Sequence, residues 1–350
     1  MKRKFSRKAL VALFAVSALA LSACSSGDDA SGDVKVSLIL KNQTNPFFVS
    51  MVKGAEAKAA ELGIDLTISS GKEEGDDAAQ IAAIENAISA KHAGIVITVM
   101  STNVNAAITK AREAGLLVIA LDTPTDPADI ADITFATDNR EAGRLIGQWG
   151  AKKLGGQKAV IALLNIFDDR VSPVDYLRDN GFLEGMGIPV NDPNKMADEA
   201  KTGKYSGGDY EIVGNVATGA NEDGGRSGME KLLARNPNIN IVYTINEPTA
   251  IGACAALKAA KKTAIMVSVD GGLSGIEAVK SGCIGATSQQ YPLRMADIGL
   301  QAIYDLVQSG KKPEVTPGKD FFDTGVTLIT DDPQDGVPSE STQYGIDNAW

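Results

Sequence analysis

The sequence contains few of the residues on which metal centres and catalytic sites depend. Among its 350 residues are one histidine, His92, and three cysteines, Cys24, Cys254 and Cys283. Three cysteines do not make the disulfide framework of a small secreted domain, and no spacing of His and Cys is typical of a zinc site. We therefore expect no metal and no cofactor. His92 lies near a predicted helix end, where a solvated or capping role is expected.

Signatures of common α/β enzymes are also missing. No Gly-x-Gly-x-x-Gly follows the first predicted strand, and there is neither a phosphate-binding loop nor a Gly-x-Ser-x-Gly elbow. Asp122 and Asp270 can in principle form a carboxylate pair, but His92 is not placed to assist them, so we expect binding rather than catalysis. The formal net charge of −10 argues against nucleic acid as a partner.

The first residues have the pattern of a signal peptide. Basic residues crowd positions 1–8, and the uncharged apolar run that follows at 9–20 is shorter than the roughly 20 residues of a membrane-spanning helix. It ends in Leu21-Ser22-Ala23-Cys24, which resembles the lipobox of bacterial lipoproteins; an ordinary cleavage site beside an incidental cysteine is the alternative. We expect residues 1–23 to be removed, Cys24 to carry the lipid, and residues 24–33 to form a polar, acidic tether.

From residue 34 onward, short β-branched segments alternate with longer amphipathic ones. We expect strands at residues 34–40, 64–69, 95–99, 117–121, 159–164, 212–217, 239–244, 265–269 and 284–287, with helices or turns between them. Such alternation predicts βαβ units and parallel sheets. Because the pattern restarts after Asp138-Asn139, we expect an α/β protein of two doubly wound lobes rather than one large sheet.

Polar side chains follow several predicted strands, at the edge where parallel sheets bind ligands. They are Asn45, Asp122, Asn246, Asp270 and Gln290. Each alone is equally typical of a turn or a helix cap, but five together favour a site. Carboxylates and amides can each engage two neighbouring hydroxyls of a sugar ring.

An ordered series of motifs resembles the ribose-binding-protein family of type I periplasmic sugar receptors. The motifs are Asn45-Pro46-Phe47-Phe48, Ala120-Leu121-Asp122-Thr123, Thr137-Asp138-Asn139, Arg178-Asp179-Asn180-Gly181-Phe182, Asn246-Glu247, Val269-Asp270-Gly271 and Gln289-Gln290, within residues 34–310. Residues 121–127 and 286–295 are most similar to the fructose-binding branch. The resemblance implies a monosaccharide receptor of an ABC importer, fructose being the expected ligand, anchored outside the cell membrane by its lipid. It would be monomeric and would deliver the sugar to a permease.

The resemblance also implies roles for individual residues. Asn45, Asp122, Arg178, Asn246, Asp270 and Gln290 would hydrogen-bond the sugar, and Phe47 and Phe48 would cover a ring face. Phe48 lies on the apolar stripe of its helix, so core packing is its alternative, whereas Phe47 lies off the stripe. For Arg178 the alternative is a solvated ion pair.

Two departures from the ribose binders favour a larger, six-carbon ketose. Thr123 replaces an arginine, and an aromatic residue of the other lobe is missing near Ala220-Asn221. A larger site would recruit further polar residues, for which the candidates are Asn139, Asp168, Asp169 and Asn221. Ribose, an aldohexose, and a receptor that feeds a membrane sensor remain open as alternatives.

The family's architecture implies two discontinuous lobes joined by three crossings. The N-terminal lobe would comprise residues 34–138 plus 291–315, and the C-terminal lobe residues 139–290 plus 316–350. The third crossing would lie at 313–320, with residues 321–330 forming a strand of the second lobe. Cys254 and Cys283 remain as two buried thiols by default, with a disulfide as the alternative.

Overall fold

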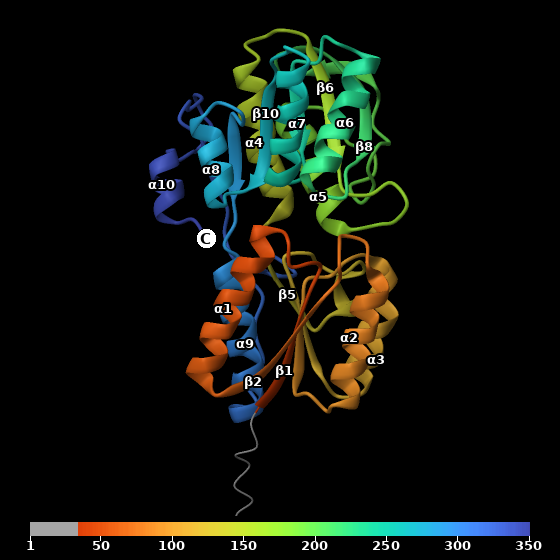
Figure 1. Ribbon diagram of the computed structural model, residues 1–350, viewed down its shortest axis with the longest axis vertical. Coiled ribbons are helices and arrows are strands. Elements are labelled where there is room, and N and C mark those ends of the chain that lie inside the picture. The colour runs from red at the N-terminus through yellow and green to blue at the C-terminus, as the bar shows by residue number, and fades with distance from the viewer. Residues whose placement is uncertain (1–33) are drawn as a thin grey trace, which may run out of the picture. The chain divides into compact units, whose positions relative to one another are not determined.

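Two β-sheets organise residues 34–350, the part of the chain that this computed structural model describes (Figure 1). The predicted signal peptide, Cys24 and the tether lie outside the described residues. Each sheet is mainly parallel and carries helices on both faces, so the predicted α/β class with doubly wound sheets is confirmed. We refer to each sheet with its helices as a lobe.

The first lobe has a six-stranded parallel sheet in the order β12-β5-β4-β3-β1-β2. Its strands are β1 (Val34–Leu40), β2 (Ile64–Ser70), β3 (Gly94–Ile97), β4 (Leu117–Leu121), β5 (Ile133–Ala136) and β12 (Phe322–Asp323). Its helices are α1 (Pro46–Leu62), α2 (Asp77–Ser89), α3 (Asn105–Glu113) and α9 (Pro292–Ser309), with 3-10 turns at Thr102–Val104 and Ala128–Ile130. Apolar residues of α1 and α9 cover one face, and those of α2 and α3 cover the other.

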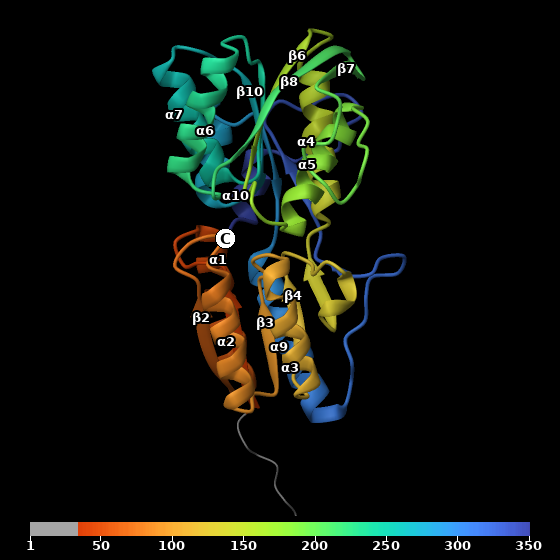
Figure 2. The same cartoon turned by 90° about the vertical axis from the view of Figure 1, so that its right-hand side faces the viewer.

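The second lobe has a seven-stranded sheet in the order β13-β11-β10-β9-β6-β8-β7. Its strands are β6 (Ala159–Asn165), β7 (Thr202–Tyr205), β8 (Gly208–Ala217), β9 (Ile241–Thr244), β10 (Ile265–Asp270), β11 (Ala286–Gln289) and β13 (Thr327–Ile329). Its helices are α4 (Asn139–Lys153), α5 (Pro173–Met186), α6 (Glu222–Arg235), α7 (Glu247–Ala259), α8 (Leu273–Lys280) and α10 (Thr342–Asp347). Figure 2 shows α4 and α5 on one face of this sheet and α6 and α7 on the other.

Two of the observed strands were not predicted from the sequence. Every predicted strand overlaps an observed one, but β5 and β7 were missed, and the single strand predicted at residues 321–330 is divided into β12 and β13. Two of them depart from the parallel pattern. β7 pairs antiparallel with β8, and β13 pairs antiparallel with β11.

The third crossing between the sheets differs from the expectation. Phe322–Asp323 pairs with β5 in the first sheet, so assigning residues 316–323 to the second lobe is wrong. The Phe322 ring packs edge-on against Phe135 with centroids 5.3 Å apart, and this aromatic contact stabilises the segment against the first sheet. Only Thr327–Ile329 joins the second sheet, so the chain crosses at residues 324–326.

The two remaining cysteines are not thiols. Cys254 and Cys283 form a disulfide with their Cα atoms 5.9 Å apart, so the default of two buried thiols is wrong. The bond joins α7 to the turn before β11, a proximity between segments 29 residues apart that spacing alone does not reveal. His92, in the turn after α2, lies with its Nδ1 2.9 Å from the Ser37 hydroxyl and is partly buried.

Residues 34–350 contain neither a candidate membrane span nor a candidate metal cluster. No helix in this range is long and apolar enough to cross a membrane. Within the same range, no cluster of three or more His, Cys, Asp or Glu side chains has a geometry that would hold a metal ion.

Candidate ligand-binding site

A small buried cavity lies where the carboxyl ends of strands from both sheets face one another. It is lined by Lys41, Asn45, Phe47, Phe48, Glu74, Asp122, Ile166, Val174, Arg178, Ala220, Ile245, Asn246 and Asp270. Most of these residues end a strand or lie in the loop after one, as expected for ligand sites of open parallel sheets. Its volume is about 30 Å³, enough for a water molecule or two but less than a sugar ring requires.

Arg178, on α5, connects the two sides of this cavity. Its Nη2 donates to Asp122 Oδ1 of the first lobe at 3.4 Å, and its Nε donates to Asn139 Oδ1 at 2.8 Å. A third donor, Nη1, reaches the Ile245 carbonyl at 3.0 Å. The side chain is only 5% exposed, so the alternative of a solvated ion pair is wrong.

A close helix contact places Arg178. A Cβ added at Gly143 of α4 would lie 2.2 Å from the Arg178 carbonyl oxygen, so a larger residue there would push α5 away from α4. Glycine at this position therefore lets the two helices approach closely enough for Arg178 to reach the cavity.

Asp122 is the first-lobe carboxylate of the site. It follows β4 with a φ of 64°, a left-handed conformation that turns the backbone at the strand end. Its Oδ2 accepts a hydrogen bond from the Thr123 hydroxyl at 2.9 Å and lies 3.9 Å from Lys41 Nζ. Thr123 is fully buried and is absent from the cavity lining, so it contacts Asp122 rather than the space beside it.

Lys41 and Glu74 are lining residues that the sequence reasoning missed. Lys41 directly follows β1 and is 2% exposed, so a lysine immediately after a buried strand was the available signal. Glu74 lies in the loop between β2 and α2 and accepts a hydrogen bond from Asn42 Nδ2 at 3.3 Å. Burial raises the pKa of the Glu74 carboxyl, opposed by the charge of Lys41. No pattern in the sequence marks this loop glutamate.

Asp270 is the corresponding carboxylate of the second lobe. Its Oδ1 accepts from Gln290 Nε2 at 3.0 Å, and its Oδ2 lies 3.4 Å from the Glu247 amide nitrogen, which donates to it. Burial raises the pKa of Asp270 to about 7, a shift that the charge of Arg178 opposes. Gln290 is absent from the cavity lining, so its hydrogen bond orients Asp270 from outside the cavity.

Glu247 forms a second buried carboxyl beside Asp270 and was also missed. It accepts hydrogen bonds from the Gly271 and Gly272 amides, at 2.8 and 3.1 Å, and from the Thr287 hydroxyl at 2.8 Å. Burial, and then the nearby charge of Asp270, raise the pKa of Glu247 to about 8. The two carboxyls therefore resist being charged together.

The two asparagines of the lining also cap helices. Asn45 Oδ1 accepts from the Phe47 amide at 3.0 Å, and Asn246 Oδ1 accepts from the Thr249 amide at 3.1 Å while its Nδ2 donates to the Ala220 carbonyl. The capping alternative is therefore correct for both residues, but it does not remove them from the cavity.

Aromatic rings close the first-lobe side of the cavity. Phe47 and Phe48 are each 3% exposed, both line the cavity and both belong to the core cluster of this lobe, so the expected distinction between them is wrong. Trp350 packs edge-on against Phe47 with centroids 5.4 Å apart and donates from Nε1 to the Gln290 carbonyl at 2.9 Å. Figure 1 shows the C-terminal residue beside the start of α1.

The remaining candidates lie outside this cavity. Asn221 caps α6 and lines a neighbouring cavity of about 280 Å³, which shares Asn45, Glu74 and Ala220 with the first. Asp169 is ion-paired with Arg170, and Asp168 is exposed and lines neither cavity.

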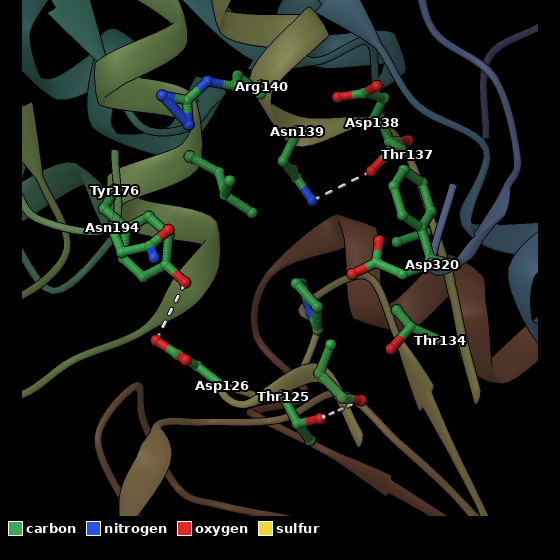
Figure 3. Close-up of a pocket in the computed structure, with 15 residues that line it drawn as sticks. Thr125, Asp126, Thr134, Thr137, Asp138, Asn139, Arg140, Tyr176, Asn194 and Asp320 are labelled. Atoms are coloured by element: carbon green, nitrogen blue, oxygen red, sulfur yellow. Dashed lines mark hydrogen bonds between the residues drawn. The ribbon is translucent and has the colours of Figure 1, made fainter. Parts of the chain in front are cut away.

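Asn139 lines a third cavity, of about 320 Å³, where the two lobes join (Figure 3). There Tyr176 of α5 donates from its hydroxyl to Asp126 Oδ2 of the first lobe at 3.2 Å. Asn139 itself donates to the Asp122 and Thr137 carbonyls and accepts from Arg178, so it supports the site without lining its cavity.

These features define a ligand-binding protein with two α/β lobes and a polar cleft between them. Residues 36–312 match the family model for the periplasmic binding protein domain, and the chain belongs to this family. The family consists of solute-binding proteins, so the protein is a binding protein rather than an enzyme.

Several characterised relatives and solved structures are similar over nearly their whole length. A ribose import binding protein of Haemophilus influenzae is 29% identical over 309 residues, covering 88% of this chain and 96% of the relative. The D-allose-binding periplasmic protein of Escherichia coli is 26% identical, covering 84% and 91%. A crystal structure of an ABC transporter solute-binding protein from Agrobacterium vitis with bound D-fucose is 24% identical, with a TM-score of 0.73 and coverage of 90% and 100%.

Proposed function

We propose that the protein captures a monosaccharide outside the cell membrane and delivers it to an ABC importer. The observation that carries this proposal is the set of buried carboxylate, guanidinium and amide groups at the strand ends, beside two phenylalanine rings. The ribose-binding and allose-binding relatives and the fucose-bound neighbour support a sugar as the class of ligand.

The donors and acceptors of the cleft match a ring with several hydroxyls. Asp122 and Asp270 each offer two acceptor oxygens, Arg178 offers fixed N–H donors, and the amides of Asn45 and Asn246 supply both kinds of group. The C–H face of a sugar ring is apolar and packs against aromatic rings. We therefore assign the hydrogen bonding to these five polar residues, with Phe47 and Phe48 against a ring face.

The cavity volume implies that the lobes separate before the ligand enters. About 30 Å³ does not hold a monosaccharide, and the cavity walls come from both lobes. We propose that the two lobes open about the chain crossings near residues 138, 291 and 324–326, admit the sugar, and close on it. Only in the closed state can the polar groups of both lobes bond the sugar at once, so binding shifts the population toward the closed state.

We propose fructose as the preferred sugar and ribose as a weaker ligand. Thr123 is buried against Asp122 and brings no charge to the site. Ala220 lines both the small cavity that Arg178 spans and the neighbouring cavity of about 280 Å³. A small side chain here leaves room for a ring with an extra carbon. Lys41 adds a buried donor on the opposite wall.

We also propose a lipid anchor at Cys24, a monomeric state and an ABC permease as partner. The lipobox-like sequence and the polar tether support the anchor. A receptor that serves a membrane sensor would use the same site. Deleting the gene distinguishes the two, because an import receptor is needed for sugar uptake and a sensor's receptor is needed only for signalling.

Isothermal titration of the purified protein with a panel of sugars tests the proposal. The panel contains D-fructose, D-ribose, D-allose, D-fucose and D-glucose. We expect fructose to bind at least tenfold more tightly than ribose. A panel in which ribose binds best would overturn the fructose assignment, and one in which no sugar binds would overturn the sugar-receptor proposal.

A further inference from the structure

A further contact joins the lobes away from the cavity, at the loop between β6 and α5. In this loop Arg170 of the second lobe donates from Nη1 to the Gly75 carbonyl at 2.7 Å and to Asp77 Oδ2 at 3.0 Å, both in the first lobe. Beside it, the Thr102 amide of the first lobe donates to the Val171 carbonyl at 3.0 Å. Arg170 is absent from the cavity lining.

The guanidinium of Arg170 is held in place by its own lobe. Its Nε and Nη2 both donate to the Asp169 carboxylate at 2.9 Å, and its Cζ lies 5.1 Å from the centroid of the buried Phe167 ring. This leaves Nη1 to reach across to the first lobe. An arginine fixed in this way loses little side-chain entropy when the cross-lobe bonds form.

The first lobe presents a matching acceptor. The two oxygens of Asp77 accept hydrogen bonds from the Ser101 hydroxyl at 2.9 Å and from Asn103 Nδ2 at 2.8 Å, which orient the carboxylate before Arg170 arrives. Gly75 has a φ of 93°, and a Cβ there would lie 3.1 Å from Arg170 Nη1. A glycine therefore suits both the backbone conformation and the close approach of the guanidinium.

The same loop also forms part of the cavity wall. Ile166 and Phe167 begin the loop, and Asp175 of α5 accepts hydrogen bonds from both of their amides at 3.0 Å. Ile166 lines the cavity, four residues from Arg170. A contact that Arg170 makes with the first lobe therefore fixes a loop that lines the cavity.

We propose that Arg170 is a clasp that holds the lobes closed and so sets how long the sugar stays bound, without touching the sugar. The clasp consists of Arg170, Asp77 and the Gly75 carbonyl. The ligand part of this inference rests on the proposed sugar-binding function. The clasp itself exists between the lobes and is testable without ligand.

Arg170→Ala and Arg112→Ala form a matched pair of variants. Arg112 also contacts one carboxylate, Asp132, and two backbone carbonyls, but all of them lie in the first lobe. With D-fructose as the probe, we expect Arg170→Ala to raise the dissociation rate about three- to tenfold in stopped-flow measurements, with a smaller change in the association rate. Arg112→Ala should leave the dissociation rate unchanged.

A double-variant cycle ties the effect to the cross-lobe pair. Once Asp77 is replaced in Asp77→Ala, the further change Arg170→Ala should raise the dissociation rate much less than it does alone. Two results would overturn the proposal: equal dissociation rates in the wild type and Arg170→Ala, or fully independent effects of the two substitutions.

A ligand-free measurement keeps the clasp testable if the sugar assignment fails. Spin labels at Glu113→Cys and Lys231→Cys, exposed residues on the first and second lobes, report the distance between the lobes. We expect Arg170→Ala to shift the ligand-free distance distribution toward longer values than either the wild type or Arg112→Ala. Identical distributions in all three proteins would refute the clasp, whereas absence of sugar binding in all three would refute only the proposed function.

Discussion

Arg178 Nη2 and Asp122 Oδ1 lie 3.4 Å apart, the first on α5 of the second lobe and the second after β4 of the first lobe. Both side chains are 5% exposed, so each charge has little water to solvate it. A buried charge that loses its partner is strongly destabilised, so the pair favours contact between the lobes until other polar groups replace it. A sugar hydroxyl between the two groups can accept from one and donate to the other.

The first prediction concerns Asp270. Asp270→Ala should weaken sugar binding by at least about 2 to 3 kcal/mol, roughly a hundredfold, because hydroxyls that bond this carboxylate would lose their partner in a closed cleft. Calorimetric titration measures the loss. Thermal melting of the same variant provides the control: unchanged affinity together with a lowered melting temperature would assign Asp270 a structural role only.

The second prediction is a pH dependence of stability. The pKa values of Glu247, about 8, and Asp270, about 7, are raised by burial. Between about pH 4, near the unfolded values, and pH 8, the folded state therefore binds more protons than the unfolded state, and the free energy of unfolding falls as pH rises.

Urea unfolding at pH 5, 6, 7 and 8 checks this dependence. Glu247→Gln should make the decline shallower, although Asp175, whose pKa burial raises to about 7, keeps some of it. Glu277→Gln, a change at an exposed residue of α8, is the matched control and should leave the slope as it is. Stability that rises with pH across this range would contradict the prediction.

The third prediction separates support of the site from support of the fold. Thr123→Val keeps the side-chain volume but removes the hydroxyl that donates to Asp122, so we expect sugar affinity to fall about fivefold, equivalent to about 1 kcal/mol. Thr125 is also buried, but its hydroxyl bonds the Ala128 carbonyl and the Ala131 amide instead. Thr125→Val should lower the melting temperature and leave affinity unchanged. Equal affinities of the two variants would argue against a role for Thr123.

The fourth prediction concerns the disulfide. Replacing both cysteines, in Cys254→Ala with Cys283→Ala, should lower the free energy of unfolding by about 3 to 4 kcal/mol, since the bond closes a loop of 29 residues. Sugar affinity should stay the same, because neither residue lines the cavity. Denaturant unfolding and titration measure the two quantities. A stability equal to that of the wild type would show that the bond adds nothing to the folded state.

The fifth prediction tests the anchor. Cys24→Ala should move the exported protein from the membrane fraction to the soluble fraction without changing its sugar affinity. Ser26→Ala, a change within the tether, is the control and should stay with the membrane. Fractionation and immunoblotting measure both. A Cys24→Ala protein that is exported normally but remains on the membrane would exclude the lipid anchor.

The sequence predicted the sheets better than their connections. Long amphipathic helices carry a periodic signal, and buried strands such as β1 and β6 appear as short apolar runs. Asp122 and Asp270 were found because both come at the end of such a strand. The four-residue strands β5 and β7 were missed. The strand predicted at residues 321–330 divides into β12 and β13, so the lobe assigned to residues 316–323 was wrong.

Within the site, two of the missed residues share one property. Glu74 and Glu247 reach their places through loops and helix starts, where sequence position says little about direction. The disulfide and the contact between Trp350 and Phe47 join segments far apart in the chain, and distances of that kind are set by tertiary packing. For Asn45 and Asn246, capping and site roles were treated as alternatives, but each side chain caps a helix and also lines the cavity.

The polar groups of the cleft are already bonded to one another: Arg178 to Asp122, Gln290 to Asp270, and Asn246 to the Ala220 carbonyl. An arriving solute therefore competes with bonds that the protein makes internally. A small polyol with few hydroxyls can replace only some of these hydrogen bonds and leaves other polar groups without a partner. A complete sugar ring can replace more of them and so keep the lobes closed. We therefore expect these internal bonds to favour ring-shaped sugars over small polyols.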